Sequence, residues 1–182
     1  PKLKTLDIRD YQLNAIPEPV FGMSNLTNLQ LPRCSIELTG QSVNALATLE
    51  KLQTLDLSHN LLGRTPDLRN LKACETLRLN NTGLTDVPVG LFDLPHLIDA
   101  SLSDNAITEL PDPLPLAADG RAITYNFSNN PLSPQSQRSL GTYNTANELR
   151  LAEERKRWVR PGQELDDFRD SDFSDGEELP EA

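Results

Sequence analysis

One pattern of leucines, written twice in succession, constrains this 182-residue chain more than any other feature. The first copy reads Leu52-x-x-Leu55-x-Leu57-x-x-Asn60-x-Leu62. The second copy reads Cys74-x-x-Leu77-x-Leu79-x-x-Thr82-x-Leu84. Each copy places apolar residues at offsets 1, 4, 6 and 11 and a hydrogen-bonding residue at offset 9.

The spacing of this pattern has a direct structural meaning. Leu55 and Leu57 flank Asp56, so a short strand would turn two leucines inward and one carboxylate outward. The residue at offset 9 follows the strand, and its side chain can satisfy backbone groups left unpaired in the turn. One such unit cannot bury its leucines alone, so neighbouring units must stack, which is the signature of leucine-rich repeats.

The same template fits six consecutive units, which begin at Leu3, Leu26, Leu52, Cys74, Leu97 and Ala122. The spacings are 23, 26, 22, 23 and 25 residues, within the range of this repeat class. In the sixth unit Tyr125 and Phe127 replace the strand leucines, as expected where a stack ends. We therefore predict an α/β solenoid with short parallel strands on its concave face and mixed helical and turn returns.

The segments that return between strands differ from one another. Residues 41–49 lack proline and glycine and carry apolar residues at helical spacing, so we predict one true helix there. For the other returns we expect single turns, 3₁₀ pieces or extended chain. At the end of the array, Ser133 and Pro134 predict the start of a helix that ends near Leu140, before Gly141. We expect a second helix from residue 147 or 148 to 160, packed through Leu149, Ala152 and Val159.

Charge and composition divide the chain into three predicted regions. They are a repeat solenoid over residues 1–132, a helical cap over 133–160, and an acidic, disordered tail over 161–182. The chain has a formal charge of -10. The tail has nine acidic residues and one basic residue, Arg169, so its charge is -8, and residues 1–160 carry the remaining -2. Such a balance disfavours nucleic acid or an anionic membrane surface as a partner. We expect neither a signal peptide nor a membrane span, and we expect that the chain was cut from a longer protein, because its first repeat begins without a cap.

The cysteine usage is typical of an intracellular protein, whereas the glycosylation sequons could accept glycans only in a secreted one. Cys34 and Cys74 fall at offsets 9 and 1 of non-adjacent repeats, so we predict both to be buried and unpaired. Sequons occur at Asn25, Asn80 and Asn126, and we interpret these residues as ordinary polar positions of the repeat.

A search for catalytic motifs finds none in this sequence. His59 and His96 fall on different parts of the repeat, which disfavours a metal site shared between them. Offset 1 points Cys74 into the core, where a thiol is inert. No phosphate loop, dinucleotide fingerprint or nucleophile elbow occurs. We therefore expect no metal, no cofactor and no small-molecule ligand.

What remains is a surface, because offsets 3, 5, 7 and 8 project from the concave sheet. The central candidates for contact with another protein are Thr54, Asp56, His59, Thr76, Arg78, Asp99, Ser101 and Asn126. Concave solenoid faces are where such proteins bind, and arginine is enriched at binding hot spots. Asp56 and Arg78 could also simply pair across adjacent strands. A merely solvated polar face is the alternative interpretation.

The last two units add a family resemblance. Leu102-Ser-Asp-Asn-Ala-Ile-Thr-Glu-Leu-Pro111 and Tyr125-Asn-Phe-Ser-Asn-Asn-Pro-Leu-Ser-Pro134 resemble the final repeats of bacterial proteins that join leucine-rich repeats to a novel E3 ubiquitin-ligase (NEL) domain. The secreted effectors of Shigella and Salmonella and related pseudomonad toxin-like proteins belong to this family. The resemblance covers roughly residues 84–158 and includes a charged helix bearing Arg157-Trp158.

The resemblance implies that the repeats select a host protein for ubiquitination. In the family a Cys-x-Asp cysteine accepts ubiquitin, but Ser35-Ile36 follows Cys34 and Glu75-Thr76 follows Cys74, so no catalytic residue carries over. We expect a recognition module of a secreted effector that acts in the host cytoplasm, with the ligase domain outside this chain. The alternatives are a cytoplasmic scaffold or signalling protein with no ligase domain and a fragment of an extracellular receptor.

Overall fold

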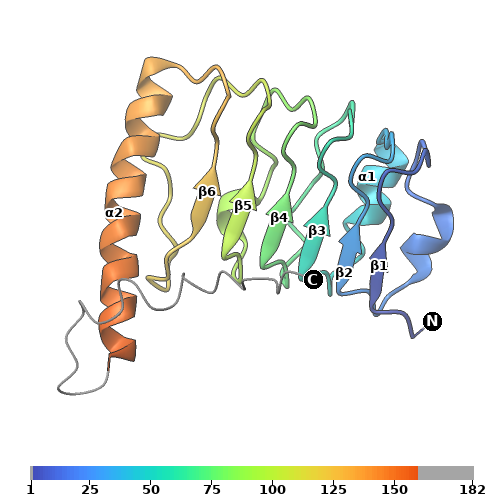
Figure 1. Cartoon of the computed structure of the whole chain (residues 1–182), viewed down its shortest axis with the longest axis horizontal. Coiled ribbons are helices and arrows are strands. Elements are labelled where there is room, and N and C mark those ends of the chain that lie inside the picture. The colour runs from blue at the N-terminus through green and yellow to red at the C-terminus, as the bar shows by residue number, and fades with distance from the viewer. Residues whose placement is uncertain (1, 160–182) are drawn as a thin grey trace, which may run out of the picture.

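The computed structural model describes residues 2–159, and it shows six short parallel strands in one sheet, ordered as in the chain (Figure 1). The strands are β1 (Thr5–Asp7), β2 (Asn28–Gln30), β3 (Thr54–Asp56), β4 (Thr76–Arg78), β5 (Asp99–Ser101) and β6 (Thr124–Asn126). Every strand spans offsets 3 to 5 of its repeat, and each residue pairs with the same offset in the next strand. The predicted solenoid and its six-repeat register are confirmed.

The core is a column of strand side chains stacked from repeat to repeat. At offsets 4 and 6, the residues of repeats 2 to 5 are all fully buried, for example Leu55 and Leu57. In the last repeat Tyr125 and Phe127 fill the same positions, and Tyr125 packs edge-on against Phe92. Leu6 and Ile8 are only partly buried, because β1 has a neighbouring strand on one side. Repeated burial of leucines therefore supplies most of the stabilisation, at roughly 25 cal/mol per Å² of apolar surface.

The returning segments run behind the sheet and carry little regular structure (Figure 1). Helix α1 (Gly40–Leu46) confirms the helix predicted there, although it ends three residues early. Thr39 begins this helix with a capping box, in which its side chain accepts from the Ser42 amide. Short 3₁₀ helices, η1 (Glu18–Gly22) and η2 (Leu91–Asp93), form two of the other returns, as predicted.

Asparagine side chains at offset 9 tie consecutive repeats together. The Asn60 Oδ1 atom accepts from the Cys34 and Ile36 amides, both at 2.9 Å. The Asn60 Nδ2 atom donates to the carbonyls of Leu31, Leu57 and Ser58 at 2.8–3.1 Å. Asn105 and Asn130 repeat this arrangement. Thr82 does not, because its hydroxyl contacts the Leu79 carbonyl of its own repeat and Asn105 Oδ1 of the next repeat, and this hydroxyl has no bond to the preceding repeat among the described residues. The role predicted for offset 9 is confirmed.

Offset 8 has a conformation that sequence reasoning missed. Its six residues all adopt a left-handed backbone with φ between 52° and 58°: Asp10, Arg33, His59, Asn81, Asp104 and Asn129. In the first five repeats the offset-8 amide donates to the offset-7 carbonyl of the next repeat. Asparagine and aspartate tolerate this conformation better than other non-glycine residues, which explains four of the six choices.

The C-terminal region differs from its prediction in two respects. One continuous helix, α2 (Pro134–Trp158), replaces the two predicted helices, although Ser133 caps it as expected. Gly141 lies inside α2 and does not end it. A single glycine in a helix costs only about 1 kcal/mol relative to alanine, which the rest of the helix can offset. The predicted packing face is also wrong, since Leu149 and Ala152 are exposed while Ser136, Ser139, Tyr143 and Asn147 are buried. The predicted tail over residues 161–182 lies outside the described residues.

Helix α2 lies beside β6 at the end of the sheet (Figure 1). It closes the stack through hydrogen bonds to the outer edge of the last repeat. In the first five repeats, the offset-2 carbonyl accepts a hydrogen bond from a backbone amide of the next repeat. No strand follows β6 among the described residues, and the Tyr143 hydroxyl donates to the Ile123 carbonyl instead, at 2.7 Å. Asn147 Oδ1 accepts from the Ile123 amide, and Glu154 Oε1 accepts from the Ala122 amide. The helix therefore replaces the missing strand with side-chain partners, as buried backbone groups require.

Candidate protein-binding face

The concave sheet brings seven of the eight predicted contact residues together on its strands, at offsets 3 and 5. His59, at offset 8, lies instead in the left-handed turn that follows β3. Arg78 and Asn126 are exposed, and Thr54, His59, Thr76, Asp99 and Ser101 are half-buried. Asp56 is only 6% exposed and offers little surface to a partner. Its carboxylate accepts hydrogen bonds from the Ser58 amide at 2.9 Å and the Ser58 hydroxyl at 2.6 Å.

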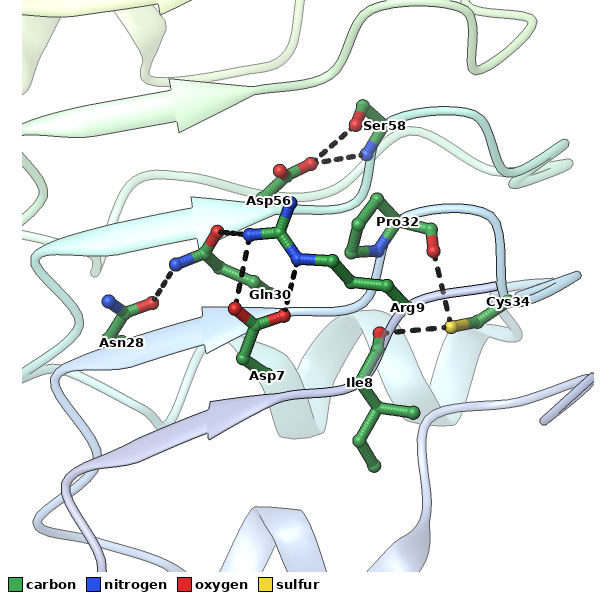
Figure 2. A network of polar contacts seen from close by, with 9 residues as sticks. All are labelled: Asp7, Ile8, Arg9, Asn28, Gln30, Pro32, Cys34, Asp56 and Ser58. Carbon is green, nitrogen blue, oxygen red and sulfur yellow. Dashed lines mark hydrogen bonds and ion pairs between the residues drawn. The ribbon is translucent and has the colours of Figure 1, made fainter. Parts of the chain in front are cut away.

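The N-terminal half of the face is occupied by its own polar network (Figure 2). Arg9 donates to both Asp7 carboxylate oxygens, at 2.8 and 3.1 Å, and to Gln30 Oε1 at 2.8 Å. Gln30 in turn donates to Asn28 at 2.9 Å. The hydrogen bond from Arg9 holds the pKa of Asp7 below its usual value. Sequence reasoning placed these residues on the face but missed the network, although its signal was the polar side chains at offsets 5 and 7 of the first repeat.

Arg78 pairs differently from the alternative considered for it. Asp56 and Arg78 are direct neighbours in register on β3 and β4. The ion pair of Arg78 is nevertheless with Asp99 on β5, at 4.0 Å between Nη2 and Oδ2. This separation is beyond hydrogen-bonding distance, and both side chains remain more than two-fifths exposed.

The histidines lie in separate environments. His59 Nδ1 lies 3.0 Å from the side-chain nitrogen Nδ2 of Asn81, and His59 Nε2 lies 3.4 Å from Nδ2 of Asn80. His96 is exposed on a returning segment, where it lines a shallow depression with Glu50, Asn70, Lys72 and Ala73. Among residues 2–159, no three His, Cys, Asp or Glu side chains gather as a metal site would require.

The cysteines have no features of a catalytic nucleophile. Cys34 and Cys74 are both free and buried, as predicted. Burial, with a smaller contribution from the neighbouring Glu75 carboxylate, raises the pKa of the Cys74 thiol to about 12. Since the thiolate is the reactive form, this thiol is inert near neutral pH.

In the described part of the chain, no helix combines the length and hydropathy that crossing a membrane requires.

Comparison with known proteins agrees with this architecture. The family model described as Leucine Rich Repeat matches residues 51–71. The chain is 32% identical over 90 residues to the rat volume-regulated anion channel subunit LRRC8D, a match that covers 49% of this chain and 10% of that protein. It is 34% identical over 108 residues to rabbit fibromodulin, covering 58% of this chain and 71% of that sequence.

A solved leucine-rich repeat protein of Leptospira interrogans has the same fold, with a TM-score of 0.57 and 21% identity over 79% of this chain and 47% of that one. The chain spans about a tenth of the length of the channel subunits that it resembles. From the repeat register, the matched family model and the fibromodulin likeness together, the chain belongs to the leucine-rich repeat proteins.

Proposed function

We propose that this chain recognises another protein through the concave face of its solenoid, as the partner-selecting part of a larger protein. The observation that carries this proposal is the polar sheet face itself. Its offset-3 and offset-5 side chains project from six aligned strands, while the core side chains of the same strands are buried. Solenoids use such extended concave surfaces for binding.

We further propose that the larger protein is a bacterial ubiquitin ligase of the leucine-rich repeat and NEL type, which acts as a secreted effector in the host cytoplasm. The support is the resemblance of residues 102–111 and 125–134 to the last repeats of that family. The Ser133 cap is consistent with it, because α2 begins directly after the final repeat, where the family joins its repeats to the catalytic part.

A ubiquitin-charging assay on the full-length gene product tests the ligase proposal. The product is incubated with E1, E2 and ubiquitin and resolved without reductant, with the present chain as control. We expect a reductant-sensitive ubiquitin adduct on the full product and none on the present chain, whose two cysteines are buried. A folded full product that forms no adduct would refute the ligase proposal and leave the binding proposal intact.

The likeness to a channel subunit and to fibromodulin favours a second candidate function. In this alternative the chain is a binding solenoid attached to no ligase domain. The charging assay separates the two candidates, because only the first predicts a thioester.

A further inference from the structure

The two halves of the concave face differ in how far their side chains are already hydrogen bonded. The N-terminal half comprises offsets 3 and 5 of repeats 1 to 3. Four of its six side chains, those of Asp7, Asn28, Gln30 and Asp56, bond to other side chains, whereas the Thr5 and Thr54 hydroxyls form no hydrogen bond among the described residues. The guanidinium beside this half, that of Arg9, already donates to Asp7 and Gln30, so a partner group that accepts from it would have to displace them. Because hydrogen bonds exchanged in this way gain little, this half is a poor binding site.

The other half, which we name the C-terminal grid, consists of Thr76, Arg78, Asp99, Ser101, Thr124 and Asn126. Within residues 2–159, the side chains of Thr76, Ser101 and Thr124 form no hydrogen bond or ion pair. Asn126 accepts from Ser128 and keeps its amide donors available. The grid therefore presents hydrogen-bond donors to solvent at positions fixed by the sheet.

Arg78 lies at the centre of the available donors. It is the only basic residue of the C-terminal grid, and its side chain is 47% exposed. Ser101 is its direct neighbour on β5, about 4.8 Å away, as in any pair of sheet strands. Its contact with Asp99 is too long for a hydrogen bond, so its guanidinium donors are not used within the described residues.

We propose that the C-terminal grid binds a protein segment that presents an aspartate or glutamate carboxylate to Arg78. This inference rests on the proposed binding function and specifies the chemistry of the partner. A guanidinium pairs with a carboxylate through two parallel hydrogen bonds, which is stronger and more directional than a neutral contact. The hydroxyls of Thr76 and Ser101 can donate to the remaining lone pairs of that carboxylate.

Asp99 sets the affinity of this site by competing with the partner. Its carboxylate faces the same guanidinium at 4.0 Å and would repel an incoming carboxylate. Loss of the Asp99 charge therefore favours the partner, whereas loss of Arg78 removes the site. The two substitutions move the affinity in opposite directions, which a merely solvated face would not produce.

The experiment uses the whole chain and three pools of fluorescein-labelled degenerate nine-residue peptides. One pool has Asp or Glu at its central position, the second has Asn or Gln there, and the third has Lys or Arg. Binding is followed by fluorescence anisotropy at 0.15 M salt, with thermal unfolding as a check on each variant. We expect the wild-type chain to bind the acidic pool most tightly. Arg78→Ala should weaken that binding about tenfold or more. Asp99→Asn should strengthen it about two- to fivefold.

Two further variants separate this inference from the general binding proposal. Gln30→Ala alters the N-terminal half and should leave binding unchanged, whereas Ser101→Tyr obstructs the C-terminal grid and should abolish it. If the acidic pool binds no better than the amide or basic pool, the inference is overturned. If Ser101→Tyr abolishes binding but Arg78→Ala does not weaken it, the face binds proteins and the acidic partner is wrong. If no substitution on the concave face changes binding, the proposed binding face fails as well.

Discussion

Replacement of Asn60 by alanine tests the claim that offset 9 holds the stack together. The Asn60 side chain is 1% exposed and makes five hydrogen bonds, three of them to the preceding repeat. Alanine would leave the amides of Cys34 and Ile36 without partners, and both residues are fully buried. Each buried unsatisfied group costs about 1–3 kcal/mol, so the substitution should destabilise the protein by about 2–6 kcal/mol. That loss is a large fraction of the roughly 5–15 kcal/mol that stabilises a typical domain.

Urea unfolding followed by far-UV circular dichroism measures this loss. Fluorescence of the single tryptophan is a poor probe, because Trp158 is 86% exposed at the end of α2. Thr54→Ala is the matched control, since its hydroxyl has no hydrogen bond among the described residues, and it should change stability by no more than about 0.5 kcal/mol. The m-values must agree, because a change would signal lost cooperativity between repeats. A loss below about 1 kcal/mol for Asn60→Ala at an unchanged m-value would refute the bridging role.

Three further predictions follow from the same structure. Leu79→Ala should destabilise the stack by about 2–5 kcal/mol in urea titrations, whereas Arg78→Ala should cost no more than about 0.5 kcal/mol, and comparable losses would mean that the strand register is wrong. Gly90→Ala should destabilise the protein by about 1–3 kcal/mol, because φ at Gly90 is 90° and the new Cβ would lie 2.8 Å from the Arg69 backbone nitrogen. Gly141→Ala should instead stabilise the protein by about 0.5–1 kcal/mol, because Gly141 lies inside α2 with open space around it. Calorimetric melting of both variants measures the two opposite changes in stability. The raised pKa of the Cys74 thiol, about 12 against 9.0 when unperturbed, means that the folded state retains a proton that the unfolded chain loses above pH 9. Stability should therefore fall from pH 9 towards 12, by up to about 1.4 kcal/mol per pH unit from this group, and Cys74→Ala should flatten the decline seen in urea titrations at each pH.

The repeats could be predicted because their contacts recur at a fixed spacing. Leu55 and Leu77 meet the same neighbours one repeat apart, so a single template assigned every strand, the buried face and the exposed face. The template also located the bridging role of offset 9. It could not show which polar side chains would pair on the concave face, because Arg78 reaches Asp99 diagonally instead of its register neighbour Asp56. Such choices depend on side-chain length and direction, which spacing alone does not encode.

The left-handed turn at offset 8 did leave a signal in the sequence. Asparagine or aspartate occupies four of its six positions, and these residue types tolerate positive φ best. His59 and Arg33 obscured the signal, because both adopt the same backbone despite less suitable side chains. The offset-8 amides bond to the next repeat, so interactions between repeats outweigh the local preference of a single residue.

The wrong prediction for the packing face of α2 shows where reasoning from apolar periodicity stops being valid. The sequence predicts packing through Leu149 and Ala152, because a helix beside a core normally buries an apolar stripe. Helix α2 instead meets the edge of a sheet, where the unsatisfied groups are backbone amides and carbonyls. Tyr143 and Asn147 bond to both polar atoms of Ile123, and these contacts require polar side chains on the buried face. A helix that ends a stack of parallel strands should therefore be sought by hydroxyl and amide residues at helical spacing, since the surface that it covers is polar.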